Sequence, residues 1–104
     1  MVHHPHTTAE YDELKNVKDK LVVVDFSAEW CGPCKFIGPT FEQYSKEYQD
    51  VVFIHVDVDE LESLPDGADV RGVPTFKYFK NGALLDSFSG ANKDKLKELL
   101  DKHR

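Results

Sequence analysis

The chain has 104 residues, enough to bury one hydrophobic core but not two, so residues 1–104 are predicted to form a single domain. Nineteen acidic against thirteen basic side chains give a net charge of −6, which argues against a broad surface for nucleic acid or an anionic membrane. No apolar run approaches the length of a membrane span and the first residues are unlike a signal peptide, so we expect a cytoplasmic protein.

The first segment, Val2 to His6, is predicted to be a short edge strand, because Pro5 has no N–H to donate to a central ladder. His3, His4 and His6 are residue types that bind transition metals. They supply no closed tetrahedral set, and terminal residues are usually mobile, so we predict no metal site. The alternative to a metal site is that these histidines belong to a frayed terminal segment.

A helix is predicted next, beginning after Thr7 and running to about Asp19. Thr7 and Glu10 have the spacing of a capping box, in which each side chain accepts a hydrogen bond from the other residue's backbone N–H. Apolar residues then follow at helical intervals, at Tyr11, Leu14 and Val17.

Leu21 to Phe26 is a β-branched, apolar run that does not alternate, which is typical of a strand buried on both faces. A helical pattern begins where the two cysteines lie, and Pro39 inside it should bend the axis. One face of this helix is apolar, at Cys34, Ile37, Phe41, Tyr44 and Tyr48.

The two cysteines therefore fall at a strand-to-helix turn. Free N–H groups at a helix start favour a thiolate, so Cys31 is predicted to be the attacking sulfur, exposed to solvent. Cys34, on the apolar face, is predicted to lie deeper and to resolve a mixed disulfide. Gly32 and Pro33 fit this turn and hold the two sulfurs near disulfide geometry. A zinc half-site is the alternative, although a structural zinc needs four ligands and the chain has only two cysteines.

Val51 to Val58 is predicted to be a second strand, parallel to the first through a right-handed crossover. Between Asp59 and Asp69 we expect a short or broken helix, because Pro65-Asp66-Gly67 is a turn signal within the segment. A surface loop without a role is the alternative.

The last part of the chain is predicted to be a hairpin followed by a helix. Asn81-Gly82 joins Phe76–Phe79 to Ala83–Phe88, Gly90 ends the hairpin, and Asn92 caps a helix. The apolar face of that helix lies at Leu96, Leu99, Leu100 and His103. The element order βαβαβαββα predicts an α/β protein with a mixed sheet of four to five strands and helices on both faces.

One stretch carries a family resemblance: Asp25, six residues before the first cysteine, and Trp30-Cys31-Gly32-Pro33-Cys34-Lys35. The chain resembles the thioredoxin family over essentially its whole length. The resemblance implies the thioredoxin fold and reduction of protein disulfides without a bound cofactor. It also implies a monomer that receives electrons from NADPH through a flavin-containing thioredoxin reductase. Peroxiredoxins and ribonucleotide reductase are the substrates it implies, and Gly-Pro between the cysteines favours electron donation.

Asp25 is interpreted as a buried carboxylate whose pKa is raised by desolvation, so that it can accept the proton of Cys34. A solvated carboxylate at a strand end is the other interpretation. In bacterial members of the family, a lysine occupies the position of His55. A histidine replaces that cation only partly, because it titrates near neutrality.

Pro74 matches the family's cis-proline, which implies a free backbone at Val73 for pairing with an extended substrate. Lys35 adds positive charge near the thiolate or is simply solvated. An exposed apolar patch around Cys31 is then expected from Trp30, Gly32, Pro33, Val73, Pro74, Gly90 and Ala91, each of which taken singly is ordinary core or turn.

Two other functions fit parts of the sequence. An oxidase or isomerase would use the same dithiol in an oxidising compartment, but the Gly-Pro dipeptide and the missing signal sequence argue against it. A binding module or complex subunit would use the surface without any redox turnover.

Overall fold

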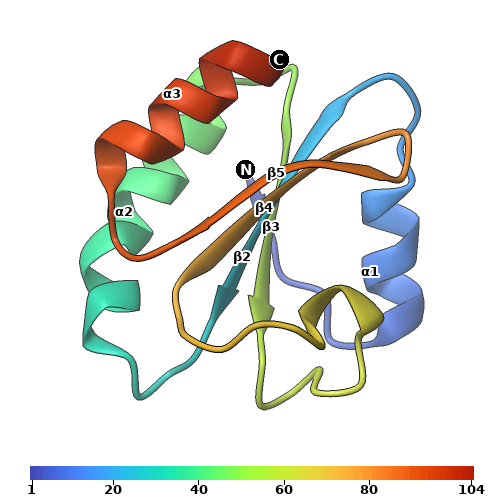
Figure 1. Ribbon diagram of the computed structural model, residues 1–104. Helices are drawn as coiled ribbons and strands as arrows, with labels where there is room; N and C mark the ends of the chain where they lie inside the picture. The colour runs from blue at the N-terminus through green and yellow to red at the C-terminus, as the bar shows by residue number, and fades with distance from the viewer.

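The computed structural model describes residues 1–104 (Figure 1). It contains five strands, three α-helices and one 3-10 turn, which in chain order are β1 (Val2–His3), α1 (Thr8–Lys15), β2 (Leu21–Ser27), α2 (Gly32–Glu47), β3 (Val52–Asp57), η1 (Pro65–Gly67), β4 (Thr75–Lys80), β5 (Ala83–Ser89) and α3 (Lys93–His103). None of the helices is both long and apolar enough to cross a membrane.

The strands form one mixed sheet in the order β1-β3-β2-β4-β5. Strands β1, β3 and β2 are parallel, whereas β4 runs antiparallel to β2 and β5 antiparallel to β4. Helices α2 and α3 cover one face of the sheet and α1 covers the other (Figure 1). The predicted mixed sheet with helices on both faces is therefore confirmed, with the N-terminal strand at an edge.

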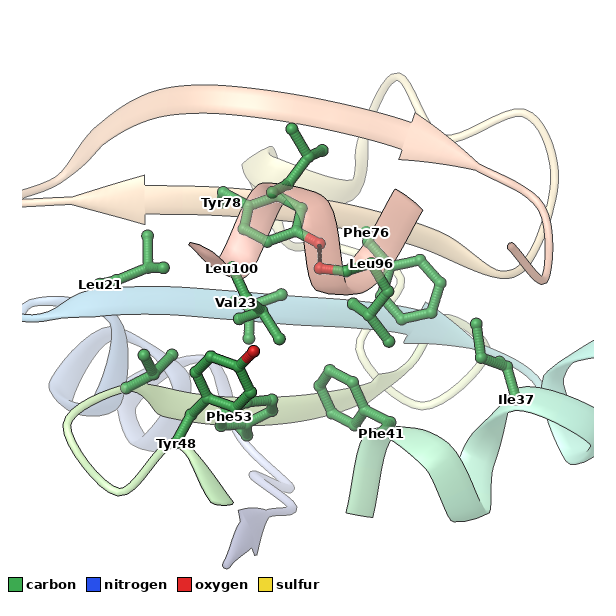
Figure 2. Close-up of a cluster of buried hydrophobic side chains, with 12 residues drawn as sticks. Leu21, Val23, Ile37, Phe41, Tyr48, Phe53, Phe76, Tyr78, Leu96 and Leu100 are labelled. Atoms are coloured by element: carbon green, nitrogen blue, oxygen red, sulfur yellow. Dashed lines mark hydrogen bonds between the residues drawn. The ribbon is translucent and has the colours of Figure 1, made fainter. Parts of the chain in front are cut away.

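The central strand β2 is buried along its whole length because each face of the sheet has its own core. On the side of α2 and α3, twelve buried residues pack together, and Figure 2 shows aromatic rings from β3, β4 and α2 meeting around Val23. On the side of α1, nine buried residues pack together, and Val22 and Val24 are two of them. The lack of alternation between Leu21 and Phe26 reflects this double burial.

The start of α1 follows the prediction in part. The Thr7 hydroxyl oxygen accepts the Glu10 N–H at 3.1 Å, as expected. The Glu10 carboxylate, however, accepts the N–H of His6 at 3.0 Å rather than that of Thr7. The helix also ends at Lys15, earlier than predicted, with Asn16 as its C-cap. Asp19, further along, has a left-handed φ of 61°, so the chain does not return to a right-handed helix before β2.

The hairpin and the last helix form as predicted. Asn81 and Gly82 both have positive φ, 51° and 81°, which is the backbone of a two-residue turn between antiparallel strands. The Asn92 side chain accepts the Lys95 N–H at 2.9 Å and caps α3.

The segment from Asp59 to Asp69 differs from the prediction. It holds only the 3-10 turn η1, so the element order has one helix fewer than expected. It is not a loop without a role either, because Leu61 and Leu64 are buried in the core beside α1. Proline and glycine interrupt the helix locally, while these two leucines anchor the segment.

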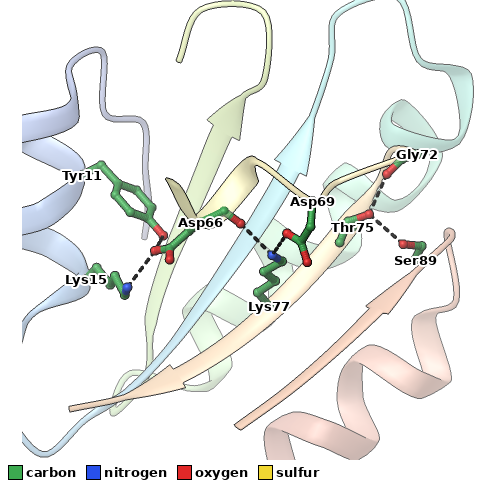
Figure 3. A network of polar contacts seen from close by, with 8 residues as sticks. All are labelled: Tyr11, Lys15, Asp66, Asp69, Gly72, Thr75, Lys77 and Ser89. Atoms are coloured by element: carbon green, nitrogen blue, oxygen red, sulfur yellow. Dashed lines mark hydrogen bonds and ion pairs between the residues drawn. The ribbon is translucent and has the colours of Figure 1, made fainter. Parts of the chain in front are cut away.

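Polar contacts fasten the same segment to its neighbours (Figure 3). The Asp66 carboxylate accepts the Tyr11 hydroxyl at 2.6 Å and pairs with Lys15 at 2.7 Å. The buried ammonium of Lys77 on β4 donates to the Asp66 carbonyl at 2.6 Å and pairs with Asp69. The segment is thus held by α1 on one side and by β4 on the other.

Candidate active site at the start of helix α2

The two cysteines lie where β2 gives way to α2. They form a disulfide with a Cα–Cα distance of 5.3 Å. Cys31 is the N-cap of α2, and its Sγ accepts the backbone N–H of Cys34 at 3.1 Å. Gly32 opens the helix and Pro33 follows in its first turn, where a missing N–H costs no helical hydrogen bond. The position of the pair agrees with the prediction.

The predicted difference in exposure is wrong for the disulfide form. Cys31 is 4% exposed and Cys34 is 5% exposed. Both are buried because Ala28, Val58 and Val73 pack against them. The two sulfurs differ in their polar surroundings instead, since only that of Cys31 accepts a helix N–H, and it also lies 3.5 Å from the Val73 carbonyl oxygen.

Asp25 is buried, as predicted, and is not a solvated strand end. It is 1% exposed, and its Oδ1 has no hydrogen-bond partner. It lies two residues after Val23 on β2, so it shares the sheet face that α2 covers. Burial raises the pKa of the Asp25 carboxyl to about 7. This carboxyl can therefore take up or release a proton near neutral pH.

His55 is the direct neighbour of Asp25 across the pair β2 and β3. Burial, together with the nearby His4 ring at 5.1 Å, lowers the pKa of His55, so its imidazole is neutral at neutral pH. Burial alone accounts for the raised pKa of Asp25. His55 therefore supplies no positive charge beside Asp25 at neutral pH.

The residues expected to surround Cys31 fall into two groups. Trp30 is 71% exposed, with its indole N–H donating to Asp59 at 2.9 Å, and Gly32 and Pro33 are also exposed. Val73, Gly90 and Ala91 are half-buried. The patch is therefore less exposed than predicted.

Pro74 is buried, so it supports this surface from behind rather than forming part of it. Its carbonyl accepts the Gly90 N–H at 2.8 Å, which ties the start of β4 to the end of β5. The Val73–Pro74 peptide bond is cis, as the resemblance implied. Neither the N–H nor the carbonyl oxygen of Val73 takes part in a backbone hydrogen bond.

Two hollows flank the dithiol, and the sequence indicated neither. One, of about 170 Å³, is lined by Trp30, Val58, Gly67, Val70, Arg71, Gly72 and Val73. The other, of about 210 Å³, is lined by Ser27, Ala28, Glu29, Cys34, Lys35, His55 and Asp57. Sequence reasoning did not identify the lining residues between Val58 and Gly72. They belong to an irregular segment, and only tertiary contacts place it beside Trp30.

Phe36 was also missed. It is 60% exposed on α2, and the Lys93 ammonium lies 4.4 Å from the centre of its ring. The available signal was its position, because Phe36 is an aromatic residue that falls outside the apolar face running from Cys34 through Ile37.

The N-terminal histidines line neither of the two hollows described above. His4 and His6 line a third hollow with His55, and His6 pairs with Glu60 at 3.1 Å. No group of three or more histidine, cysteine, aspartate or glutamate residues is arranged to hold a metal ion.

A disulfide that caps the helix after the central strand, together with a buried acid on the same sheet face, defines the thioredoxin-fold thiol–disulfide oxidoreductases. Residues 2–102 match the family model for Thioredoxin. The chain belongs to the thioredoxin family. It is 49% identical to a thioredoxin of Ictalurus punctatus, covering 100% of this chain and 99% of that one. It is 48% identical to a thioredoxin of Homo sapiens, covering 90% of each.

Solved structures agree with this relationship. A thioredoxin of Plasmodium falciparum superposes with a TM-score of 0.91 at 44% identity, covering 98% of this chain and 99% of that one. A thioredoxin of Fasciola hepatica gives a TM-score of 0.92 at 43% identity, with the same coverage. The thioredoxin fold is confirmed, and the chain has protein-disulfide reductase activity, a form of thiol–disulfide oxidoreductase chemistry.

Proposed function

We propose that Cys31 is the nucleophile of this reductase, Cys34 the resolving thiol and Asp25 the proton acceptor. The Cys31 thiolate attacks one sulfur of a target disulfide, forms a mixed disulfide and releases the target's other sulfur as a thiolate. Cys34 then loses its proton to Asp25 and attacks Sγ of Cys31. The second target thiolate leaves, and the Cys31–Cys34 disulfide remains.

The N-cap position of Cys31 is the observation that carries this proposal. An N–H donor 3.1 Å from Sγ and the positive end of α2 favour negative charge on this sulfur. Cys34 lies inside the helix and has no comparable donor. The helix therefore favours the Cys31 thiolate as the attacking group. Gly32 and Pro33 tune the dithiol by fixing this turn, and Lys35 adds a nearby positive charge.

Asp25 suits the proton transfer because its pKa of about 7 lies near the working pH. An ordinary aspartate would remain ionised and would be a poor proton acceptor. Burial on the face covered by α2 supports its role in the resolving step.

An extended segment of the target is proposed to bind beside Cys31. The N–H and carbonyl of Val73, which make no backbone hydrogen bond, can pair with its backbone, as in the addition of a strand. Trp30 and the hollow next to it receive an apolar side chain. Gly32, Pro33, Gly90 and Ala91 complete the contact surface, and Pro74 supports it from beneath.

The family relationship supports the remaining proposals. Thioredoxin reductase restores the dithiol with electrons from NADPH, and peroxiredoxins and ribonucleotide reductase are among the targets. The protein works in the cytoplasm as a monomer, with residues 1–104 acting as one domain and with no bound cofactor.

Partner trapping tests the assignment of roles. The Cys34→Ser variant should keep target proteins attached to Cys31 through disulfides that dithiothreitol releases. The Cys31→Ser variant should trap no target and reduce no insulin disulfide. If Cys31→Ser still reduces insulin, or if partners become linked to Cys34 in the wild type, the assignment is wrong. A binding module, by contrast, would keep its partners without any covalent link.

A further inference from the structure

Lys77 is the only lysine or arginine of the chain that is buried. It lies on β4 with 5% of its surface exposed, two residues before Phe79 of the core beside α1. Its ammonium group is 5.6 Å from the centre of the Phe26 ring. Burying a charge costs free energy that burying an apolar side chain would not cost. The charge therefore indicates a role beyond filling the core.

The ammonium group of Lys77 holds the chain at and after η1 at two points (Figure 3). It donates to the Asp66 carbonyl at 2.6 Å and pairs with the Asp69 carboxylate. The backbone hydrogen bonds of residues 66–72 stay within this segment or reach only the two residues before it. The contacts from Lys77 therefore attach to the sheet a turn whose own backbone is bonded to no strand.

Thr75 holds the far end of the same segment. It is two residues from Lys77 on β4, so both side chains lie on the same face of the sheet. Its hydroxyl donates to the Gly72 carbonyl at 2.6 Å. Residues 66–72 are thus attached to β4 near both ends, and Lys77 makes the two contacts at the beginning.

The attached segment forms one wall of the hollow beside Trp30. Gly67 and Val70 each directly follow a residue that Lys77 contacts, and both line the hollow. Lys77 itself is not part of the lining. It can therefore affect the hollow only by holding this wall in place.

We propose that Lys77 is a positioning residue that fixes this wall and thereby sets how tightly the hollow binds an apolar side chain of a protein substrate. The inference rests on the proposed binding of that side chain beside Trp30. A wall that is already ordered binds a ligand at a lower cost in free energy than a wall that becomes ordered on binding. Without the contacts from Lys77, substrate binding has to order the wall. Affinity should then fall, while the exchange between sulfurs keeps its rate.

The Lys77→Met variant separates substrate binding from stability. Replacing a buried ion pair by an apolar side chain is often neutral or stabilising, so the free energy of unfolding should be unchanged or higher. Fully reduced protein is mixed with increasing concentrations of insulin, and formation of the Cys31–Cys34 disulfide is followed by acid quenching and alkylation of the remaining thiols. We expect the half-saturating insulin concentration to rise by about three- to tenfold, with the limiting rate unchanged.

Two further variants complete this experiment. Lys80→Met removes an ammonium group from the same strand that makes no hydrogen bond or ion pair, so the half-saturating concentration should not change. Asp69→Ala removes one contact of Lys77 from its exposed end, and it keeps the inference testable if Lys77→Met does not fold. We expect a rise of about two- to threefold for Asp69→Ala. A half-saturating concentration that stays at the wild-type value in both Lys77→Met and Asp69→Ala overturns the inference.

A pair of peptide disulfides tests the hollow itself. The two peptides carry either leucine or alanine on both sides of the cysteine and are otherwise identical. The wild type should bind the leucine peptide more tightly, and Lys77→Met should lose most of that preference. An equal preference in the two proteins refutes the role of Lys77. In that case, normal partner trapping by Cys34→Ser still leaves the proposed function intact.

Discussion

Burial of the Asp25 carboxyl lowers the stability of the folded protein but gives the raised pKa that proton transfer needs. The carboxyl is buried, and Oδ1 has no hydrogen-bond partner. Because the ionised form is desolvated without compensation, the folded protein binds a proton more tightly at this position than the unfolded chain does. The raised pKa therefore predicts a pH dependence of stability and a pH dependence of the reaction rate.

The first prediction concerns stability against pH. The folded pKa of Asp25 is about 7 and its ordinary value is 3.8, so its contribution to stability is most favourable below pH 4 and is lost as the pH rises through 7. Asp25→Asn removes this dependence and should raise the unfolding free energy of the oxidised protein at pH 8 by up to about 4 kcal/mol. Denaturation with guanidinium chloride from pH 4 to 9 measures it. A variant less stable than wild type at pH 8 would contradict the desolvation argument.

The second prediction concerns the resolving step. Only the ionised form of Asp25 accepts the Cys34 proton, so resolution should accelerate as the pH rises, with an inflection near 7. A mixed disulfide prepared on Cys31 at pH 4 and jumped to higher pH isolates this step. In Asp25→Asn the inflection should disappear and the rate at pH 8 should fall by about 10²-fold. Identical pH profiles for the two proteins would rule out Asp25 as the acceptor.

Among the elements, the segment from Asp59 to Asp69 depends most on tertiary contacts. Its backbone forms one short 3-10 turn, and its position is set by two buried leucines and by Asp66. Tyr11 reaches Asp66 from α1 with a hydroxyl that donates at 2.6 Å. Burial and the carboxylate together raise the pKa of Tyr11, so this hydroxyl stays protonated and keeps donating.

The third prediction tests that attachment. Tyr11→Phe removes the donor to Asp66 and should cost about 1.5 kcal/mol, as expected for a hydrogen bond to a charged acceptor. Amide hydrogen exchange between residues 61 and 70 should become faster. Tyr44→Phe is the matched control, because the Tyr44 hydroxyl makes no hydrogen bond and the ring is half-buried. Similar losses in both variants would mean that the hydroxyl contact does not hold the segment.

The fourth prediction uses two glycines with opposite roles. Gly82 has a φ of 81° in the hairpin turn, so Gly82→Ala should destabilise the protein by about 1 kcal/mol. Gly38 lies inside α2, and a Cβ added there meets nothing within 4 Å. Gly38→Ala should therefore stabilise the protein by about 0.5–1 kcal/mol. Thermal unfolding of the two variants compares them directly, and a shift of the same sign in both would defeat this explanation.

At the scale of the whole molecule, the disulfide closes only a short loop, but it raises the free energy of unfolding of the whole chain because it restricts the unfolded state. The two cysteines are three positions apart. The chain-entropy relation for so short a loop gives about 2 kcal/mol of stabilisation. The oxidised protein should therefore unfold at a higher denaturant concentration than the same protein in excess reductant. A reduced form of equal or greater stability would contradict the fifth prediction.

The parts of the fold predicted correctly are those with a local physical signal. Asn81 and Gly82 supply the positive φ values that their turn needs, and Asn92 supplies the oxygen that caps α3. The burial of β2 on both of its faces could be predicted from the sequence, because the four consecutive residues from Leu21 to Val24 are all apolar. The strand order then follows from the crossover and hairpin rules.

The parts that were not predicted depend on contacts between distant segments. The loop between α1 and β2 is held at Asp19, whose backbone N–H donates to Asn81 at the hairpin tip, 2.8 Å away. The burial of Cys31 depends on Val58 and Val73, which approach it from two other segments. No local pattern around these residues contains that information. The burial of Asp25 was predicted from the family resemblance, because the apolar strand taken alone left a solvated strand end as the more common interpretation.

The central claim is that α2 makes the two sulfurs unequal once the disulfide is reduced. The most direct measurement is the rate at which iodoacetamide labels each cysteine of the fully reduced protein between pH 5 and 9. The account predicts that at pH 6.5 Cys31 reacts at least about tenfold faster than Cys34, with a pKa below the ordinary thiol value of about 8.5. Equal labelling rates for both cysteines across that range would contradict it.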